Sequence, residues 1–289
     1  MDVLTFANNG WIDDDAPVVR VRDHALWMAS TVFDGIRAFE NVIPDVDRHC
    51  ERLIASAQVM GLAPTLNAID IEILVREGVG RFPRDTALYI RPMFWASEGW
   101  AVPIAESTQF GLVVQRAPLP SSEGFSACLS PVRRPSPDTA PTEAKAACLY
   151  PATARALRTA RAAGFENAIV LDPFGNVAEF ATANLFYVTG GQVFTPQPNG
   201  TFLDGITRQR VISLLRRDGK VVVETTVQFE QVEHADEVFS TGNFGKVQPL
   251  RRLGNRKFDI GPVTRRARQL YRDYALESAG LSSALLTAL

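Results

Sequence analysis

The sequence contains few of the features that mark an exported, membrane-bound or metal-binding protein. Its three cysteines, Cys50, Cys128 and Cys148, are an odd number without a C-x-x-C spacing, which argues against a disulfide framework and a zinc site. No stretch approaches the ~20 consecutive apolar residues of a membrane span. Residues 1–15 lack the basic and apolar runs of a signal peptide. We therefore expect a cytoplasmic protein that binds no metal.

The charge balance argues against two further classes of partner. The chain has 289 residues and carries 30 basic and 32 acidic side chains, for a formal net charge of -2. This balance gives no electrostatic preference for nucleic acid or for an anionic membrane. A small-molecule partner is therefore expected. With 46% hydrophobic residues, the chain can form one large domain or two smaller ones.

Several common enzyme motifs are absent from the sequence. Gly78-Val79-Gly80 begins like a dinucleotide-binding loop, but it lacks the third glycine and follows a helical rather than a strand pattern. No P-loop, G-x-S-x-G or H-E-x-x-H motif is found, and the three histidines lie far apart in the sequence. These observations argue against an ATPase, a serine hydrolase of that type or a zinc protease.

The pattern of apolar residues predicts segregated helices and strands, which is an α+β fold. Helices are expected over residues 47–60, 150–163 and 207–217 and from Pro262 onward, because apolar positions recur there at helical spacing or a suitable first-turn proline is present. Short β-type runs predict strands. They cover residues 86–94, 168–171, 177–180, 185–188, 193–194, 221–223 and 238–241.

The domain boundary is predicted from composition. The segment APLPSSEG, residues 117–124, is rich in Pro, Ser and Gly and has no periodicity, as in a linker. We therefore expect a small N-terminal α/β domain over 1–116, an interdomain loop over 117–125 and a large C-terminal α/β domain over 126–289.

Lysine is scarce, and its four positions are not equivalent. Lys220 and Lys257 follow turn sequences and are interpreted as solvated, and Lys246 follows a glycine and is interpreted as part of a flexible turn. Lys145 lies among small residues in the segment EAKAAC, a setting that suits one long side chain entering a packed site. A neutral lysine amine can form a Schiff base with an aldehyde cofactor. The alternative is a lysine at the start of a helix that extends into solvent.

Several segments in series resemble one enzyme family. EAKAACLY (143–150), AIVLDPFGNVAEFATANLF (168–186) and TFLDGITR (201–208) resemble the fold-type-IV aminotransferases, which use pyridoxal 5′-phosphate (PLP). TVFDGIR (31–37) and ALYIRP (87–92) resemble the branched-chain amino acid aminotransferase family specifically. The resemblance extends from about residue 25 to residue 266. It implies two α/β domains of the D-amino acid aminotransferase-like fold, with PLP in the cleft between them.

The resemblance also implies how PLP is held. Lys145 would form the Schiff base and move a proton between the substrate α-carbon and the cofactor, and Glu179 would pair with the pyridine nitrogen. The phosphate would be bound by Arg52 and by the amides at a helix start. Tyr150 would donate a hydrogen bond to the ring oxygen, and Leu203 would pack on the ring. The remaining implied cofactor-binding residues are Gly205, Ile206, Thr207, Thr241 and Asn243.

The residues implied for the substrate come from several segments. Tyr89 and Arg91 alternate on one strand, so they share a face, and the resemblance assigns them to the substrate carboxylates. The other implied substrate-binding residues are Phe33, Thr182, Asn243 and Phe244. The loop with Trp100 and Val102 resembles one that the family contributes to a neighbouring subunit, which implies a homodimer or a higher homo-oligomer.

The sequence departs from the family pattern around the substrate. Met28 stands where the family has a tyrosine, Phe180-Ala181-Thr182-Ala183 replaces a Gly-x-Gly-Glu segment, and Asn243 replaces a threonine. Ala117-Pro118 stands where a tryptophan is common. Apart from Asn243, the positions implied for the cofactor are retained, so the other departures concern the choice of substrate.

These observations favour a ping-pong transaminase that moves the amino group of an L-amino acid, expected to be branched-chain, to 2-oxoglutarate. A transaminase for D-amino acids or (R)-amines is the first alternative, because of the altered pocket. An aminodeoxychorismate lyase is less favoured, because Tyr89-x-Arg91 is not the pattern expected there. A non-catalytic protein on the same scaffold is the alternative from a different class.

Overall fold

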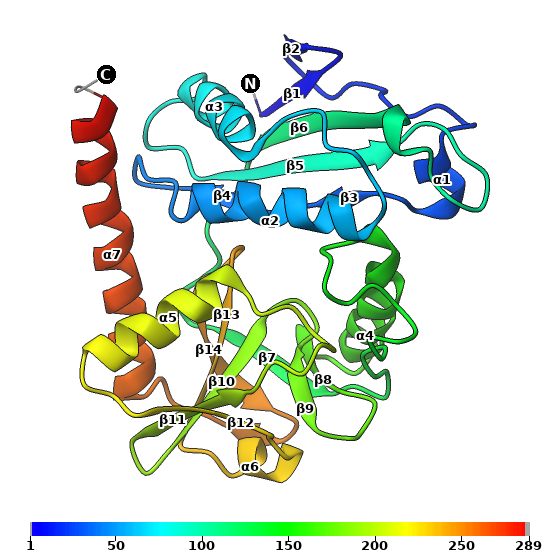
Figure 1. Cartoon of the computed structure of the whole chain (residues 1–289). Helices are drawn as coiled ribbons and strands as arrows, with labels where there is room; N and C mark the ends of the chain where they lie inside the picture. The colour runs from blue at the N-terminus through cyan, green and yellow to red at the C-terminus, as the bar shows by residue number, and fades with distance from the viewer. Residues whose placement is uncertain (1, 287–289) are drawn as a thin grey trace. The chain divides into compact units, whose positions relative to one another are not determined.

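A computed structural model describes residues 2–286 of the chain and divides into two compact units (Figure 1). The first unit contains residues up to Leu119, the segment Glu143–Leu149 and the residues from Ala275 onward. The second contains Pro120–Thr142 and Tyr150–Tyr274. The expected division into residues 1–116, 117–125 and 126–289 therefore differs at one important place, because the segment with Lys145 groups with the first unit.

The first unit is built on a six-stranded sheet with two long helices. The strand order is β2-β1-β6-β5-β3, and β4 pairs with β5; all of the pairs are antiparallel. Helices α2 and α3 pack against each other and on β5. The elements of this unit are β1 (Val3–Ala7), β2 (Gly10–Ile12), α1 (His24–Met28), β3 (Val32–Phe33), β4 (Ile36–Ala38), α2 (Val46–Val59), α3 (Ala68–Gly80), β5 (Leu88–Ala96), η1 (Ala105–Ser107), β6 (Thr108–Arg116) and η2 (Ala147–Leu149).

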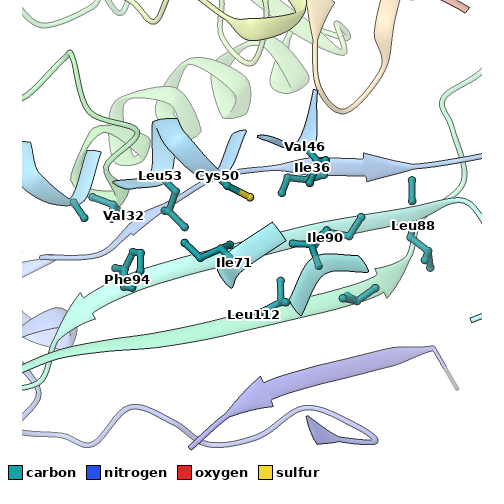
Figure 2. Close-up of a cluster of buried hydrophobic side chains, with 14 of the residues drawn as sticks. Val32, Ile36, Val46, Cys50, Leu53, Ile71, Leu88, Ile90, Phe94 and Leu112 are labelled. Carbon is teal, nitrogen blue, oxygen red and sulfur yellow. The ribbon is translucent and has the colours of Figure 1, made fainter. Parts of the chain in front are cut away.

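The core of the first unit lies between the helices and the sheet. Figure 2 shows Cys50 and Leu53 of α2 and Ile71 of α3 facing Ile90 and Phe94 of β5. All five side chains are fully buried. Burial of apolar surface at these spacings is the main term that stabilises both helices. Ala144 and Ala146 belong to the same core, which attaches their segment to this unit.

The sequence-based rejection of a dinucleotide loop is confirmed by α3. Gly78-Val79-Gly80 is the last part of this helix, which begins with a capping box between Asn67 and Asp70. A Cβ on Gly78 would lie 2.5 Å from the indole ring of Trp11. The glycine is therefore explained by close packing of a tryptophan against the helix.

The second unit contains a nine-stranded mixed sheet. Its order is β12-β11-β10-β13-β14-β7-β8-β9, with β15 paired to β14. β11–β12, β14–β7 and β7–β8 are parallel pairs, and the other pairs are antiparallel. The strands are β7 (Phe125–Leu129), β8 (Asn167–Leu171), β9 (Val177–Phe180), β10 (Asn184–Thr189), β11 (Gln192–Pro196), β12 (Val222–Thr225), β13 (Glu237–Gly242), β14 (Lys246–Leu253) and β15 (Arg256–Lys257). The helices are α4 (Tyr150–Ala162), α5 (Ile206–Arg217), α6 (Phe229–Glu233) and α7 (Pro262–Leu286), the last of which continues into residues grouped with the first unit.

The predicted α+β class is confirmed. α2, α4 and α5 begin and end within one residue of the predicted ranges, and α7 begins at Pro262 as expected. In the part of the chain that the structure describes, no helix is long and apolar enough to cross a membrane. Within the same residues, no group of three or more His, Cys, Asp or Glu side chains could hold a metal ion.

Candidate active site

Lys145 lies on a segment that is attached to the β3 region by backbone hydrogen bonds. The amide of Phe33 donates to the carbonyl of Lys145 at 3.1 Å, and the amide of Ala147 donates to the carbonyl of Thr31 at 2.8 Å. From the other side, the amide of Lys145 donates to Ser56 Oγ on α2 at 3.0 Å. Lys145 itself is not helical, and the short helix η2 begins two residues later, at Ala147.

The two neighbouring alanines determine where the Lys145 side chain points. Ala144 and Ala146 are fully buried in the core of the first unit. Lys145, between them, is only partly buried and does not belong to this core. Its ammonium lies 5.0 Å from the centroid of the Phe33 ring. The small residues around Lys145 are therefore core packing that fixes the position of a single long amine.

Arg52, expected to bind phosphate, is held by a buried carboxylate. Its Nε and Nη2 donate to the two oxygens of Asp34 at 2.7 and 2.8 Å, a bidentate pair. His49 Nδ1 lies 2.7 Å from Asp34 Oδ1. Burial alone raises the pKa of Asp34, but the charges and hydrogen bonds of Arg52 and His49 outweigh it and hold that pKa well below the usual range. The pairing fixes the orientation of the guanidinium on α2.

Tyr89 and Arg91 share one face of β5, opposite to the core residues Ile90 and Phe94. Arg91 Nε is buried and has no hydrogen-bond partner, which fits a site for an anionic oxygen group. Arg37 is paired with Tyr89 across β4 and β5 and lies 5.9 Å from its ring centroid. Burial lowers the pKa of Arg37 to about 10, although Tyr89 opposes the shift.

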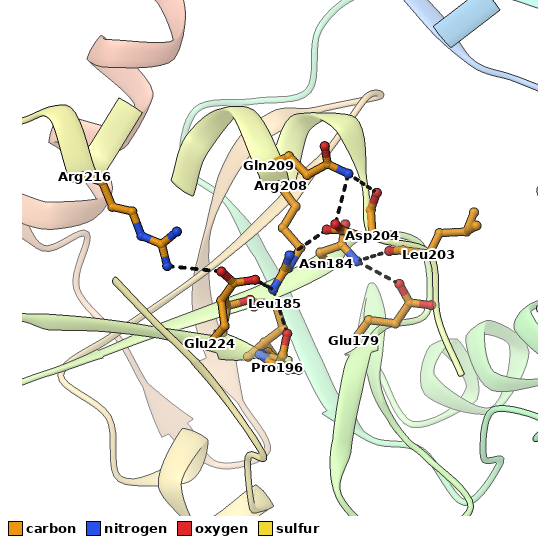
Figure 3. Close-up of polar contacts among 11 residues, drawn as sticks. Glu179, Asn184, Leu185, Pro196, Leu203, Asp204, Arg208, Gln209, Arg216 and Glu224 are labelled. Carbon is orange, nitrogen blue, oxygen red and sulfur yellow. Dashed lines mark hydrogen bonds and ion pairs between the residues drawn. The ribbon is translucent and has the colours of Figure 1, made fainter. Parts of the chain in front are cut away.

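In the second unit, Glu179 is surrounded by polar partners. Asn184 Nδ2 donates to Glu179 Oε2 at 3.3 Å and to the carbonyl of Leu203 at 2.9 Å (Figure 3). Arg134 Nε lies 3.5 Å from Glu179 Oε1. Both side chains of this ion pair are mostly buried, at 11% and 12% exposure. These contacts fix the position of a carboxylate that can accept a hydrogen bond from a ring nitrogen.

The N-terminus of α5 provides amides for an anion. Gly205 is the N-cap residue and makes no side-chain cap, and the next two residues, Ile206 and Thr207, are buried. Free amides and the helix dipole favour a negative group at this position. Thr241 on β13 is fully buried, and its Oγ1 has no hydrogen-bond partner. An unpaired buried donor of this kind fits a phosphate oxygen, so the residues present are compatible with a phosphorylated cofactor.

A buried arginine holds α5 on the sheet. Arg208 is 1% exposed, and its guanidinium donates to Asp204 at 2.6 Å, to Glu224 at 2.9 Å and to the carbonyl of Pro196 at 2.9 Å (Figure 3). These contacts tie the first turn of α5 to β11 and β12. A Cβ on Gly205 would lie 2.2 Å from Asn184 Oδ1, so only glycine allows this approach.

The other predicted residues occupy more exposed positions. Tyr150 opens α4 and is 37% exposed, and Phe244 is 56% exposed in the turn after β13. Leu203 is partly buried, and its carbonyl accepts from Asn184. Thr182 is exposed, and its Oγ1 accepts a hydrogen bond from Asn167.

Sequence reasoning missed the residues that support these side chains. Asp34, Asn184 and Arg134 were not singled out, although Asp34 and Asn184 lie inside segments that carried the resemblance. No spacing rule connects Asp34 with Arg52, because the pair forms only after α2 packs beside β3. The interpretation of Lys246 as part of a flexible turn was wrong, since this side chain is 7% exposed and hydrogen-bonded to Asn243.

Comparison with known proteins gives consistent results. Residues 31–253 match the model of the family described as amino-transferase class IV. A probable branched-chain-amino-acid aminotransferase from Rickettsia conorii is 32% identical over 261 residues, which cover 88% of this chain and 89% of that protein. The branched-chain-amino-acid aminotransferase of Escherichia coli K12 is 32% identical over 270 residues, covering 88% and 86% of the two chains.

Solved structures agree with the sequence relatives. The crystal structure of an aminotransferase from Brucella abortus bound to the cofactor PLP has a TM-score of 0.94 and 51% identity, and the match covers 95% of this chain and 99% of that one. The structure of the E. coli branched-chain amino acid aminotransferase has a TM-score of 0.86 and 28% identity, covering 95% of each chain.

Proposed function

The chain belongs to the class IV aminotransferases, and we propose that it is a PLP-dependent transaminase that uses Lys145 to bind the cofactor and transfers the amino group of a branched-chain L-amino acid to 2-oxoglutarate. The observation that carries this proposal is the fixed position of Lys145, whose backbone is hydrogen-bonded on both sides and whose neighbours are core alanines. PLP supplies an aldehyde for the lysine amine and a ring that accepts electrons.

The residues of the first unit have distinct proposed tasks. Lys145 presents one amine, which serves first to bind the cofactor and then to move a proton at the substrate α-carbon. Arg52, oriented by Asp34, binds a phosphate oxygen. Phe33, 5.0 Å from the lysine ammonium, lines the space for the substrate side chain.

The residues of the second unit have complementary tasks. Glu179 accepts a hydrogen bond from the protonated pyridine nitrogen, and Arg134 and Asn184 hold its carboxylate in place. The amides of Ile206 and Thr207 and the hydroxyl of Thr241 donate to the phosphate. Tyr150 donates to the ring oxygen, and Leu203 packs on the ring.

The substrate preference rests on Tyr89 and Arg91. A phenol and a guanidinium on one strand face supply donors for a carboxylate, and Arg91 Nε has no hydrogen-bond partner among the described residues. A site built to pair with a carboxylate discriminates strongly against an amine that lacks one. Met28 is flexible and apolar, so we also expect tolerance of unbranched and aromatic side chains.

A transaminase for D-amino acids or (R)-amines is the second candidate. It is favoured by the segment Phe180–Ala183, where Phe180 is fully buried against Phe125 instead of the family's glycine. This replacement changes the residues that follow Glu179, including Thr182, which we assign to the substrate.

We also propose a homodimer in a reducing compartment such as the cytoplasm. Exposed apolar side chains on α1 and the loop before η1 support self-association; they are Leu26, Trp27, Met28, Trp100 and Val102. All three cysteines are free thiols. Burial raises the pKa of the Cys50 thiol, which makes it unreactive.

Two experiments test the proposal. The purified protein, reduced with borohydride and digested, should carry the cofactor on the peptide with Lys145, and Lys145→Ala should lose both this adduct and all turnover, whereas Lys257→Ala should lose neither. An amino-donor panel with 2-oxoglutarate and pyruvate as acceptors should then rank L-leucine, L-isoleucine and L-valine above their D-forms and above (R)-1-phenylethylamine. Faster conversion of a D-amino acid or the (R)-amine would replace the branched-chain proposal with the second candidate.

A further inference from the structure

Lys246 is a buried amine that the proposed reaction does not use. It is 7% exposed, and its Nζ donates to Asn243 Oδ1 at 2.8 Å and lies 5.5 Å from the centroid of the Tyr271 ring. Gly242 and Lys246 face each other across β13 and β14, so Asn243, Phe244 and Gly245 form the turn between the strands. The ammonium therefore lies beneath the turn and contacts its first residue.

The backbone of Lys246 indicates that its side chain has a specific role. Its φ is 57°, in the left-handed region that glycine adopts without strain and that a residue with a Cβ adopts at a cost. Three-residue hairpin turns commonly place glycine at such a position. A lysine at this position has the backbone strain that glycine would avoid, and it also buries a charge. We attribute both costs to the contact between its ammonium and Asn243.

The contact determines which way the Asn243 amide faces. An ammonium has three N–H donors and no acceptor, so it can pair only with the carbonyl oxygen of the amide. With Oδ1 bound to Lys246, Nδ2 must point the other way. Among the residues that the structure describes, the buried Asn243 Nδ2 has no hydrogen-bond partner, and the same is true of Thr241 Oγ1 two residues earlier. Unpaired buried donors are rare unless a ligand or water completes them.

These donors lie on the same part of the sheet as the start of α5. Thr241 is paired across the strands with Asn184, and Asn184 donates to the carbonyl of Leu203, two residues before Gly205. The amides at the N-terminus of α5 favour a negative group. The two orphaned donors and the helix N-terminus therefore favour the same ligand chemistry, an anionic oxygen group.

We propose that Lys246 is a positioning residue, whose ammonium holds the Asn243 amide so that Nδ2, together with Thr241 Oγ1, donates to an anionic oxygen group. That group is either the phosphate of the cofactor or the carboxylate of the substrate. This inference rests on the proposed function and adds to it a residue that touches neither ligand. A threonine at this position would need no such orientation, because its hydroxyl can rotate.

A double-mutant cycle tests the dependence of Lys246 on Asn243. Lys246→Met should weaken binding of the anion roughly tenfold, the effect of misplacing one buried donor. In an Asn243→Thr background the same change should have less than about a twofold effect, because a hydroxyl can rotate toward the anion without help. Lys246→Gly removes the backbone strain as well as the ammonium. It should weaken anion binding as much as Lys246→Met does, but it should have a higher melting temperature than Lys246→Met. Lys257→Met, an exposed lysine of the same unit, is the control.

The readouts identify the anion and separate this inference from the proposed function. If the phosphate is the ligand, Lys246→Met should raise the dissociation constant of the apoprotein for PLP. It should leave unchanged the dissociation constant for pyridoxal, which lacks the phosphate. If the carboxylate is the ligand, PLP binding should stay constant while the KM for L-leucine rises and kcat does not fall in parallel. An equal effect of Lys246→Met in both backgrounds, or no effect in either, overturns the inference. Failure of the wild-type protein to bind PLP or to transaminate overturns the proposed function instead.

Discussion

Asp34, Arg37 and Arg208 are charged side chains that are almost completely buried. Each is paired: Asp34 with Arg52 and His49, Arg37 with the carbonyls of residues 117 and 118, and Arg208 with Asp204 and Glu224. An unpaired buried charge is strongly destabilising, so such groups persist only where partners satisfy them. Asp34 in this way orients Arg52, which is proposed to bind the cofactor phosphate, and Arg208 anchors the first turn of α5. At the scale of single residues, charge burial fixes functional side chains in position.

The role of Glu179 gives the first prediction at this scale. Glu179→Gln should keep the cofactor bound, because Lys145 and the phosphate-binding groups are unchanged, but it should slow the amino-donor half reaction by about two orders of magnitude. The loss of one preorganised electrostatic contact, on the order of 3 kcal/mol, accounts for that size. Stopped-flow absorbance of the half reaction measures it. Glu123→Gln, an exposed residue of the same unit, serves as control, and near-normal rates for Glu179→Gln would show that this carboxylate does not serve the ring nitrogen.

The pairing of Asp34 gives a pH-dependent prediction. Because the folded-state pKa of Asp34 lies below its usual value, its ionised form stabilises the fold above about pH 4, and this contribution is lost as the pH falls from there through the folded-state pKa. Asp34→Asn should therefore lower the free energy of unfolding at pH 7 by on the order of 3 kcal/mol. The gap to wild type should narrow as the pH falls below 4. Urea unfolding at a series of pH values tests both statements.

The control and the contradicting result for Asp34 are also defined. Asp13 is exposed, and Asp13→Asn should leave unfolding unchanged at every pH. If the difference between wild type and Asp34→Asn stayed constant from pH 7 to pH 3, the ion pair with Arg52 would not be its source.

At the scale of elements, α5 carries two different properties of the second unit. Its buried side chains pack on the sheet, and its N-terminus has free amides without a side-chain cap. Arg208 connects the two properties, because it anchors the first turn, where Ile206 and Thr207 present their amides. The binding geometry therefore depends on an ion pair that contacts no ligand.

Replacing Arg208 tests this dependence. Arg208→Met keeps most of the buried volume but removes three charge-assisted contacts, so we expect a loss of about 2–3 kcal/mol in stability. Relative to wild type, the dissociation constant for PLP should rise more than that for pyridoxal, because the phosphate-binding amides move while Lys145 does not. Chemical unfolding and the two dissociation constants measure these effects. Arg217→Met, at the exposed end of the same helix, should change neither, and an equal loss for PLP and pyridoxal would refute the link to the phosphate.

Elements with strong local patterns were predictable, and those formed by distant packing were not. The ranges of α2 and α5 follow from apolar residues at helical spacing. β14 was not predicted, because its sequence KVQPLRRL contains a proline and three charged residues and begins with a left-handed lysine. The same reason applies to the site: Lys145 was found by its composition and by resemblance, whereas Asp34 and Asn184 act through contacts with Arg52 and Leu203, which lie 18 and 19 residues away in the sequence.

At the scale of the whole molecule, each unit has its own core. The Lys145 segment lies in the sequence between two parts of the second unit, but it packs in the core of the first. The position of Lys145 is therefore fixed by core residues that are distant from it in the sequence. This explains why the expected boundary at residues 117–125 separated Lys145 from the strand and helix that hold it. Composition identifies linkers, but it does not reveal which core a later segment joins.

The proposed homodimer gives the last prediction. Trp100 is 80% exposed and contacts Trp27 edge to face, with ring centroids 5.2 Å apart, while Leu26 and Val102 are also exposed. Large apolar surfaces of this kind are unfavourable in water and are typical of association sites, where aromatic side chains contribute most. Trp100→Ser should raise the dissociation constant for self-association by roughly 30-fold, corresponding to about 2 kcal/mol. Light scattering over a concentration series measures this shift.

Phe174 is equally exposed on a turn of the second unit, so Phe174→Ser controls for the mere loss of a surface aromatic ring. If both variants associate alike, or if the wild-type protein stays monomeric at its highest soluble concentration, the exposed residues of α1 and the Trp100 loop do not form the subunit interface.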